Sequence, residues 1–217
     1  MWAENESKEI DIDARIVESW AEIEDTWGFV VYRCTYNDDG DWKEFMEYLT
    51  AYVQEALQAY GVEHLMSKLN WHVQEDSSFE GATKATIRQT FEDWRSRQPQ
   101  IISPRGDYCI MVDQDSLDSV LVAGKPPDDL SCLEPYVILI DRQWRQLYED
   151  ETEVPDDSKP DPARRLLDQD CEALEGCRME DVGWTMVNIA AVPIRMYSVL
   201  DTGWDIVYQR PPTVSNP

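Results

Sequence analysis

Two histidines and a small set of carboxylates are the side chains in this sequence best suited to proton transfer. His64 and His72 are the only imidazoles, so any imidazole acid–base step must use one of them. His72 is the better candidate for a catalytic base, because it follows Trp71 in an alternating, strand-like pattern and Glu75 lies three residues further on. A structural, hydrogen-bonded histidine is the alternative interpretation.

Asp113 and Asp141 each end an apolar run, and we expect both carboxylates to be partly desolvated. Desolvation raises a carboxyl pKa, so Asp113 is a second candidate for proton transfer. Together with Glu75, the two aspartates predict an acidic pocket for an ammonium or guanidinium group, with Glu75 and Asp141 as substrate-binding residues. The alternative is that both aspartates cap the helix or turn that follows.

The basic residues suggest a binding surface of the opposite sign. Arg33 lies at the end of the first predicted strand and is a candidate for holding a substrate carboxylate or phosphate. Lys84, Arg88 and Arg95 form a stripe on a predicted helix and are candidates for phosphate or nucleic-acid contact. More often such a stripe is the solvated face of an amphipathic helix.

No motif predicts a metal or a cofactor. The sequence contains no glycine-rich dinucleotide fingerprint, phosphate loop, nucleophile elbow or metalloprotease helix. The five cysteines match no common zinc spacing, and their odd number favours free thiols in a reducing compartment. They are Cys34, Cys109, Cys132, Cys171 and Cys177.

The charge narrows the class of partner. The chain has 44 acidic and 19 basic side chains, a formal charge of −25 over 217 residues. A surface this negative repels nucleic acid and anionic membranes and attracts a cationic small molecule or a basic protein. Transfer RNA is therefore opposed as a partner by the net charge.

No apolar run approaches the roughly 18 residues of a membrane span, and no secretory leader precedes the first helix, so we expect a cytoplasmic protein without membrane contact.

Periodicity predicts the elements that must position these side chains. The clearest is a helix over 41–60, with Asp41 as its cap, an apolar face at three- and four-residue steps, and Gly61 as its end. Further helices are expected over 14–24, 82–98, 116–122, 164–175 and 192–200. Strands are expected over 27–36, 69–75, 107–113, 136–141, 183–187 and 204–208.

This element order predicts an α+β fold with a mainly antiparallel sheet and helices on one face, in a ferredoxin-like arrangement with additions. We expect an acidic N-terminal extension over 1–25, a single domain over 26–212 and a frayed tail over 213–217. The segment 149–161 combines many acids with two prolines and is expected to be a solvated loop within the domain. The sequence does not indicate an oligomeric state.

The stretch over 27–36, Asp41 and Trp42 with Phe45 after it, and the ending over 204–212 resemble a large group of small acidic ascomycete proteins, most without an assigned activity. In size and in its lack of familiar catalytic motifs, the chain also resembles the arginine-containing cyclodipeptide synthases of fungal specialised metabolism. That resemblance implies an enzyme that joins an arginyl and a second aminoacyl group from charged transfer RNAs. No catalytic motif of the family can be matched to numbered positions, so the resemblance assigns no residue a role.

Two function classes follow. The first is a small fungal biosynthetic enzyme that acts on a cationic amino-acid-derived substrate, with cyclodipeptide formation as its sharpest form. The second is a non-catalytic acidic interaction protein that docks a basic partner.

Overall fold

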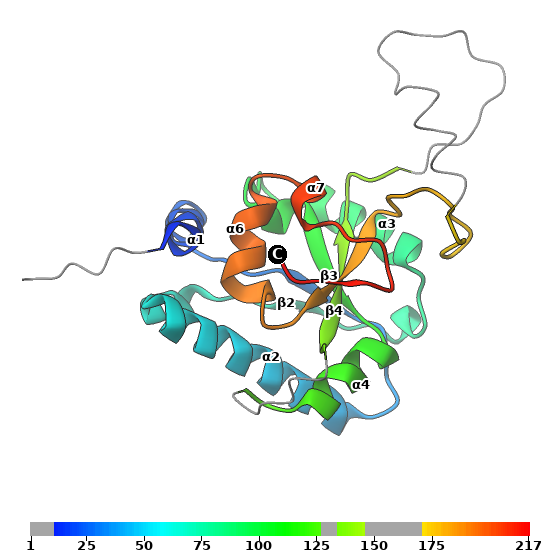
Figure 1. Cartoon of the computed structure of the whole chain (residues 1–217), viewed down its shortest axis with the longest axis horizontal. Coiled ribbons are helices and arrows are strands. Elements are labelled where there is room, and N and C mark those ends of the chain that lie inside the picture. Colours follow the sequence, from blue (N-terminus) through cyan, green and yellow to red (C-terminus); the bar gives the residue numbers. More distant parts are fainter. Residues whose placement is uncertain (1–10, 127–133, 146–170) are drawn as a thin grey trace, which may run out of the picture.

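One mixed sheet organises the molecule (Figure 1), whose computed structural model describes residues 11–126, 134–145 and 171–217. Its strands are β1 (Val30–Arg33), β2 (His72–Gln74), β3 (Tyr108–Val112), β4 (Tyr136–Asp141), β5 (Trp184–Asn188) and β6 (Val214–Ser215). They lie in the order β2-β1-β3-β4-β5-β6.

The strand directions differ from those expected. β1 pairs in parallel with both β2 and β3, and β5 pairs in parallel with β6. Only the two pairs that involve β4 are antiparallel, so in the described sheet β4 alone runs against the other five strands. The α+β class is confirmed, whereas the expectation of a mainly antiparallel sheet is wrong. The ferredoxin-like arrangement is not confirmed, because β1 lies between β2 and β3 as a parallel neighbour of both, with helices in the connections.

Helices cover both faces of the sheet, which corrects the expectation of a single covered face. The longer elements are α1 (Ile12–Ile23), α2 (Asp39–Tyr60), α3 (Lys84–Ser96) and α4 (Gln114–Ala123). The shorter ones are η1 (Glu63–Lys68), η2 (Ser77–Phe79), η3 (Pro104–Gly106), η4 (Val192–Met196), α6 (Tyr197–Leu200) and α7 (Trp204–Val207). In Figure 1, α1, α2 and α6 lie on one side of the sheet and α3 on the other.

Alternation along the strands produces two cores. On β1, Val31 faces the core shared with α1, α2, α4 and α6, whereas Val30 and Tyr32 face the core shared with α3. Side chains on a strand alternate between faces, so a four-residue strand that is buried throughout needs cover on both sides.

Local chemistry explains the limits of α2. Asp38 caps the helix by accepting hydrogen bonds from the backbone of Gly40 and Asp41. The prediction of Asp41 as the cap is therefore wrong, because the helix begins at Asp39 and Asp41 lies in its first turn. It ends at Gly61, whose φ of 71° is in the left-handed region that glycine adopts without strain. The predicted end and the predicted apolar face are both confirmed.

Both ends of the domain reach further than expected. Helix α1 buries Ala14, Val17 and Ala21 in the larger core, so the first 25 residues are not simply an extension. At the other end, the predicted strand over 204–208 is helix α7, and the predicted frayed tail over 213–217 contains β6. Of the predicted helix over 164–175, residues 164–170 lie outside the described residues and residues 171–175 are not helical; the predicted acidic loop over 149–161 also lies outside the described residues. Within the described part, no helix is both long and apolar enough to cross a bilayer.

Candidate functional site

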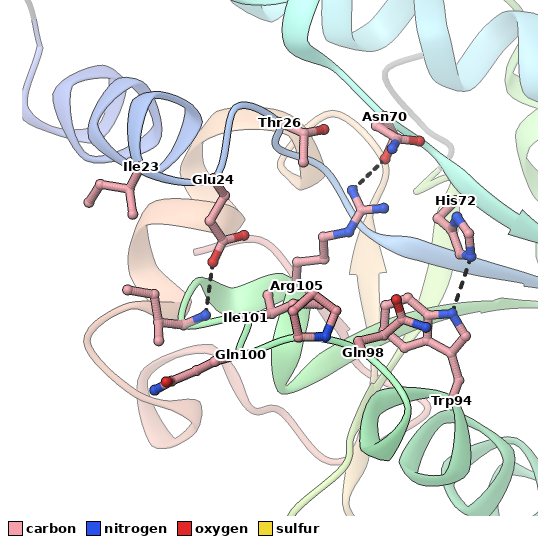
Figure 2. Close-up of a pocket in the computed structure, with 12 residues that line it drawn as sticks. Ile23, Glu24, Thr26, Asn70, His72, Trp94, Gln98, Gln100, Ile101 and Arg105 are labelled. Atoms are coloured by element: carbon pink, nitrogen blue, oxygen red, sulfur yellow. Dashed lines mark hydrogen bonds between the residues drawn. The ribbon is translucent and has the colours of Figure 1, made fainter.

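A cavity of about 440 Å³ lies at the end of the sheet where β2 and β3 begin. Its walls come from the end of α1, the start of β2, the end of α3, the loop that follows α3, and η3 (Figure 2). The volume falls in the usual range for small-molecule sites, about 300–1,000 Å³. We take this cavity as the candidate functional site.

His72 lines the cavity, and its ring contacts Trp94 of α3. The Trp94 Nε1–H donates to Nε2 of His72 at 3.2 Å, and the two ring centroids are 5.3 Å apart. An acceptor at Nε2 requires the proton of the neutral ring to be on Nδ1. Burial, and secondarily the positive charge of Arg105, lowers the pKa of His72 below 6.5, so the ring is neutral at pH 7. No described residue partners Nδ1–H, which is left to bind a ligand.

This geometry changes the role expected of His72. No carboxylate orients the ring, and Glu75 bonds instead to Trp42 Nε1 at 2.6 Å. With Nε2 occupied by Trp94, His72 presents a hydrogen-bond donor to the cavity rather than a basic lone pair. His64, the other imidazole, pairs with Glu18 at an exposed position.

Arg105 places a cation in the cavity. The residue is 5 % exposed, and its Nη1 donates to the carbonyl of Asn70 at 2.9 Å. Burial lowers its pKa from 12.5, which still leaves the guanidinium charged at neutral pH. Within the described part of the chain, no carboxylate lies within 4.0 Å of it. Arg105 thus has N–H donors to spare for a ligand oxygen.

Glu24 supplies the negative charge of the cavity and anchors part of its wall. One carboxylate oxygen accepts the backbone N–H groups of Ile102 and Ser103 at 2.8 and 2.9 Å, and the other accepts Ser103 Oγ–H at 2.8 Å. The same loop is held on its other side by Arg95, whose guanidinium donates to the carbonyls of Pro99 and Ile101. The wall is therefore fixed before any ligand arrives.

Sequence reasoning missed Arg105 and Glu24. Arg105 stands in a Pro-Arg-Gly turn directly before β3, and a turn there places its side chain at the beginning of a central strand. That signal was available in the sequence. Glu24 offered none, because it is one acid among many near the end of α1.

The residues predicted for substrate binding lie mostly at the opposite edge of the sheet. Arg33 is buried and donates to Asp39 at 2.6 Å, with Glu75 at 4.0 Å. Its guanidinium also lies 4.3 Å from the ring of Tyr36 and 5.2 Å from that of Trp42. Arg33 is thus fully engaged by its own neighbours.

Asp113 has the structural role that was its alternative interpretation. It caps α4 by accepting the Ser116 N–H at 3.0 Å, in a reciprocal capping box. Lys84, the first residue of the predicted basic stripe, lies 3.7 Å from Asp113 and 3.0 Å from Glu175. The arrangement is an ion-pair network at the ends of α3 and α4.

The predicted acidic pocket does not form. Because β4 is antiparallel to β3, Asp141 pairs with Tyr108 at the beginning of β3. Asp113 follows the other end of β3, so the two carboxylates lie at opposite ends of the strands. Glu75 follows the end of β2, at the same end of the parallel strands as Asp113. Burial raises the pKa of Asp141, as expected, but its carboxylate accepts the Gln143 N–H in a local turn.

Arg88 is a structural residue. It is buried, donates to the backbone carbonyls of Asp141, Val182 and Gly183, and lies 4.6 Å from the Trp144 ring. The three cations of the predicted basic stripe each contact oxygen atoms of the protein itself, and whether they also contact nucleic acid stays a prediction. Of the three cations, Arg95 contributes to the candidate site, because its guanidinium binds the loop that forms part of the cavity wall.

Comparison with protein-family models, with curated proteins and with solved structures found no match.

Proposed function

We propose that the chain is a biosynthetic enzyme that binds an amino-acid-derived molecule in the cavity between α1 and α3. The observation that carries the proposal is the pair of opposite charges across the cavity, Arg105 and Glu24, which do not form an ion pair with each other. Two opposite charges held apart match the amino and carboxyl ends of one small molecule. The substrate is then cationic through its amino group, which Glu24 receives.

The donors around Arg105 support acyl chemistry. Arg105 and His72 both line the cavity, and in this proposal the Arg105 N–H groups and the Nδ1–H of His72 bind one substrate oxygen together. A carbonyl oxygen bound in this way becomes polarised, and the two donors stabilise the negative charge that develops when a nucleophile attacks. His72 would act as a neutral hydrogen-bond donor, with Trp94 fixing its tautomer.

In its sharpest form, the proposal is a cytoplasmic fungal enzyme that makes arginine-containing cyclodipeptides from aminoacyl transfer RNAs. The polarised oxygen would then be that of the ester carbonyl of one aminoacyl group. The amine of the second aminoacyl group would attack the carbonyl carbon to form an amide bond, and the ester C–O bond would break as the ribose oxygen of the transfer RNA leaves with the proton that the amine gives up. The charge of −25 opposes approach of transfer RNA, so this form requires local contacts that overcome the repulsion. Mass spectrometry of cells that express the folded chain tests it, because absence of any new diketopiperazine would remove this form.

Titration with glycine tests the binding site itself. Calorimetry should detect one glycine per chain, and Arg105→Met should weaken binding by about tenfold or more through loss of a charge-assisted contact. Arg178→Met removes an exposed arginine outside the cavity lining and is the matched control. Equal affinities for the Arg105 and Arg178 variants, each confirmed as folded by its thermal melt, would refute the proposal.

The rival function is an acidic interaction protein. Exposed carboxylates of Asp38, Asp39, Glu75 and Asp76 lie at the edge of the sheet opposite the cavity, which favours docking of a basic surface there. This function predicts partner capture that fades as salt shortens the screening length to about 8 Å at physiological ionic strength. It also predicts that Arg105→Met leaves capture intact.

A further inference from the structure

We infer that the cavity selects amino-acid-derived molecules with an apolar side chain; the inference rests on the proposed function and names its substrate class. The first support is the charge inventory of the lining. Among the described residues that line the cavity, Glu24 and Arg105 carry the only full charges at pH 7, since His72 is neutral. If these two bind the amino and acyl ends of the substrate, no carboxylate is left for a basic side chain.

The second support is the position of two isoleucines at the cavity. Ile23 and Ile102 line it and are 60 % and 52 % exposed, two of the five large apolar side chains that the described part of the chain leaves in solvent. Exposed apolar side chains that converge on a cavity are typical of a binding surface, whereas isolated ones need no explanation. The apolar rim is defined here as Ile23 and Ile102.

The rim lies beside the group that would hold the amino end. Ile23 precedes Glu24 in the chain, and the backbone N–H of Ile102 donates to the Glu24 carboxylate at 2.8 Å. A substrate amino group on Glu24 therefore brings its α-carbon close to both isoleucines. Figure 2 shows Ile23 and Glu24 on one side of the cavity, with His72 and Trp94 on the other and Arg105 between them.

The side chain of the substrate then has apolar contacts in either direction. Beside Glu24 it meets the rim, and across the cavity it faces the indole of Trp94. A leucine-sized side chain gains from leaving water at either place, whereas a guanidinium would lose hydration without gaining a partner. An arginyl group, if the protein uses one, is bound elsewhere.

Calorimetric titration of the full chain with glycine, L-leucine and L-arginine tests this inference. Leucine should bind about tenfold or more tighter than glycine, and arginine should bind more weakly than leucine. In the double variant Ile23→Ser/Ile102→Ser, the ratio of leucine affinity to glycine affinity should fall at least threefold. Ile206→Ser, which removes an equally exposed isoleucine of α7 outside the lining, should leave the preference intact.

The outcomes separate the two claims. Binding of glycine with equal affinities for leucine and arginine would overturn the inference and leave the proposed function standing. A leucine preference that survives in the double variant would likewise overturn the role of the rim. Failure of all three amino acids to bind would overturn the proposed function and the inference with it.

Discussion

Removal of the Glu24 carboxylate should loosen the cavity wall and destabilise the fold. In Glu24→Ala, the backbone N–H groups of Ile102 and Ser103 and the hydroxyl of Ser103 lose their common acceptor. The three groups differ in what replaces it. Ile102 is 52 % exposed and Ser103 is 1 % exposed. We therefore expect water to replace the lost acceptor at Ile102, whereas Ser103 should not be hydrated unless the loop opens.

The cost therefore comes mainly from Ser103. A buried polar group left without a partner costs about 1–3 kcal/mol. The Ser103 hydroxyl keeps one bond, because Tyr197 donates to Ser103 Oγ at 3.0 Å, which places its loss at the low end of that range. Together the two groups give about 2–4 kcal/mol, or a fall in melting temperature of about 5–15 °C for a chain of this size.

Thermal melts followed by circular dichroism would measure the effect. Glu24→Gln keeps an oxygen that can accept both backbone N–H groups and should lose about 1 kcal/mol or less. Glu22→Ala removes an exposed acid from the same helix and is the matched control. If Glu24→Ala melts within 2 °C of Glu22→Ala, the hydrogen bonds described above do not hold the wall, and the reasoning fails.

Three further predictions concern other parts of the molecule. The lowered pKa of His72 means that the unfolded chain binds more protons at acid pH, so its free energy of unfolding should fall as pH drops below about 6.5. Urea titrations between pH 5 and 7 should show a smaller fall in His72→Gln, and an unchanged fall would contradict this. Burial raises the pKa of Cys34 to about 12 and that of Cys109 well above 9, so neither thiol should react with iodoacetamide until the chain unfolds, as peptide mass spectrometry would show. Gly183→Ala should destabilise the fold by more than 1 kcal/mol, because φ is +72° and the added Cβ would lie 2.3 Å from Trp144; a melting temperature equal to wild type would refute this.

Sequence patterns predicted the helices and strands whose determining residues lie within the element itself. Helix α2 was predictable because its cap, apolar face and terminal glycine all lie within its own residues. Strand β4 was predicted with its correct bounds, since it is a near-continuous apolar run that ends at Asp141. Helix α7 was predicted as a strand, because four residues are too few for periodicity to distinguish the two.

The site depended on causes that are not local. Asp113 and Asp141 look alike in sequence, because each follows or ends an apolar run. The strand that carries Asp141 is antiparallel to β3, so the two carboxylates lie at opposite ends of the strands. Arg105 and Glu24 come together through the packing of α1 against the loop after α3, a contact between segments nearly 80 positions apart. Single-sequence patterns specify neither strand direction nor such contacts.

The insertion of β1 between β2 and β3 has a consequence for how the chain reaches its native state. Val30 of β1 pairs with Cys109 of β3, so the central ladder joins positions about 80 residues apart. Closing so long a loop costs conformational entropy, and the hydrogen bonds between β1 and β3 offset this cost only when the two strands have come together. Folding is therefore expected to be slow relative to helical domains of similar length, with α2 forming early and the middle of the sheet assembling near the rate-limiting barrier.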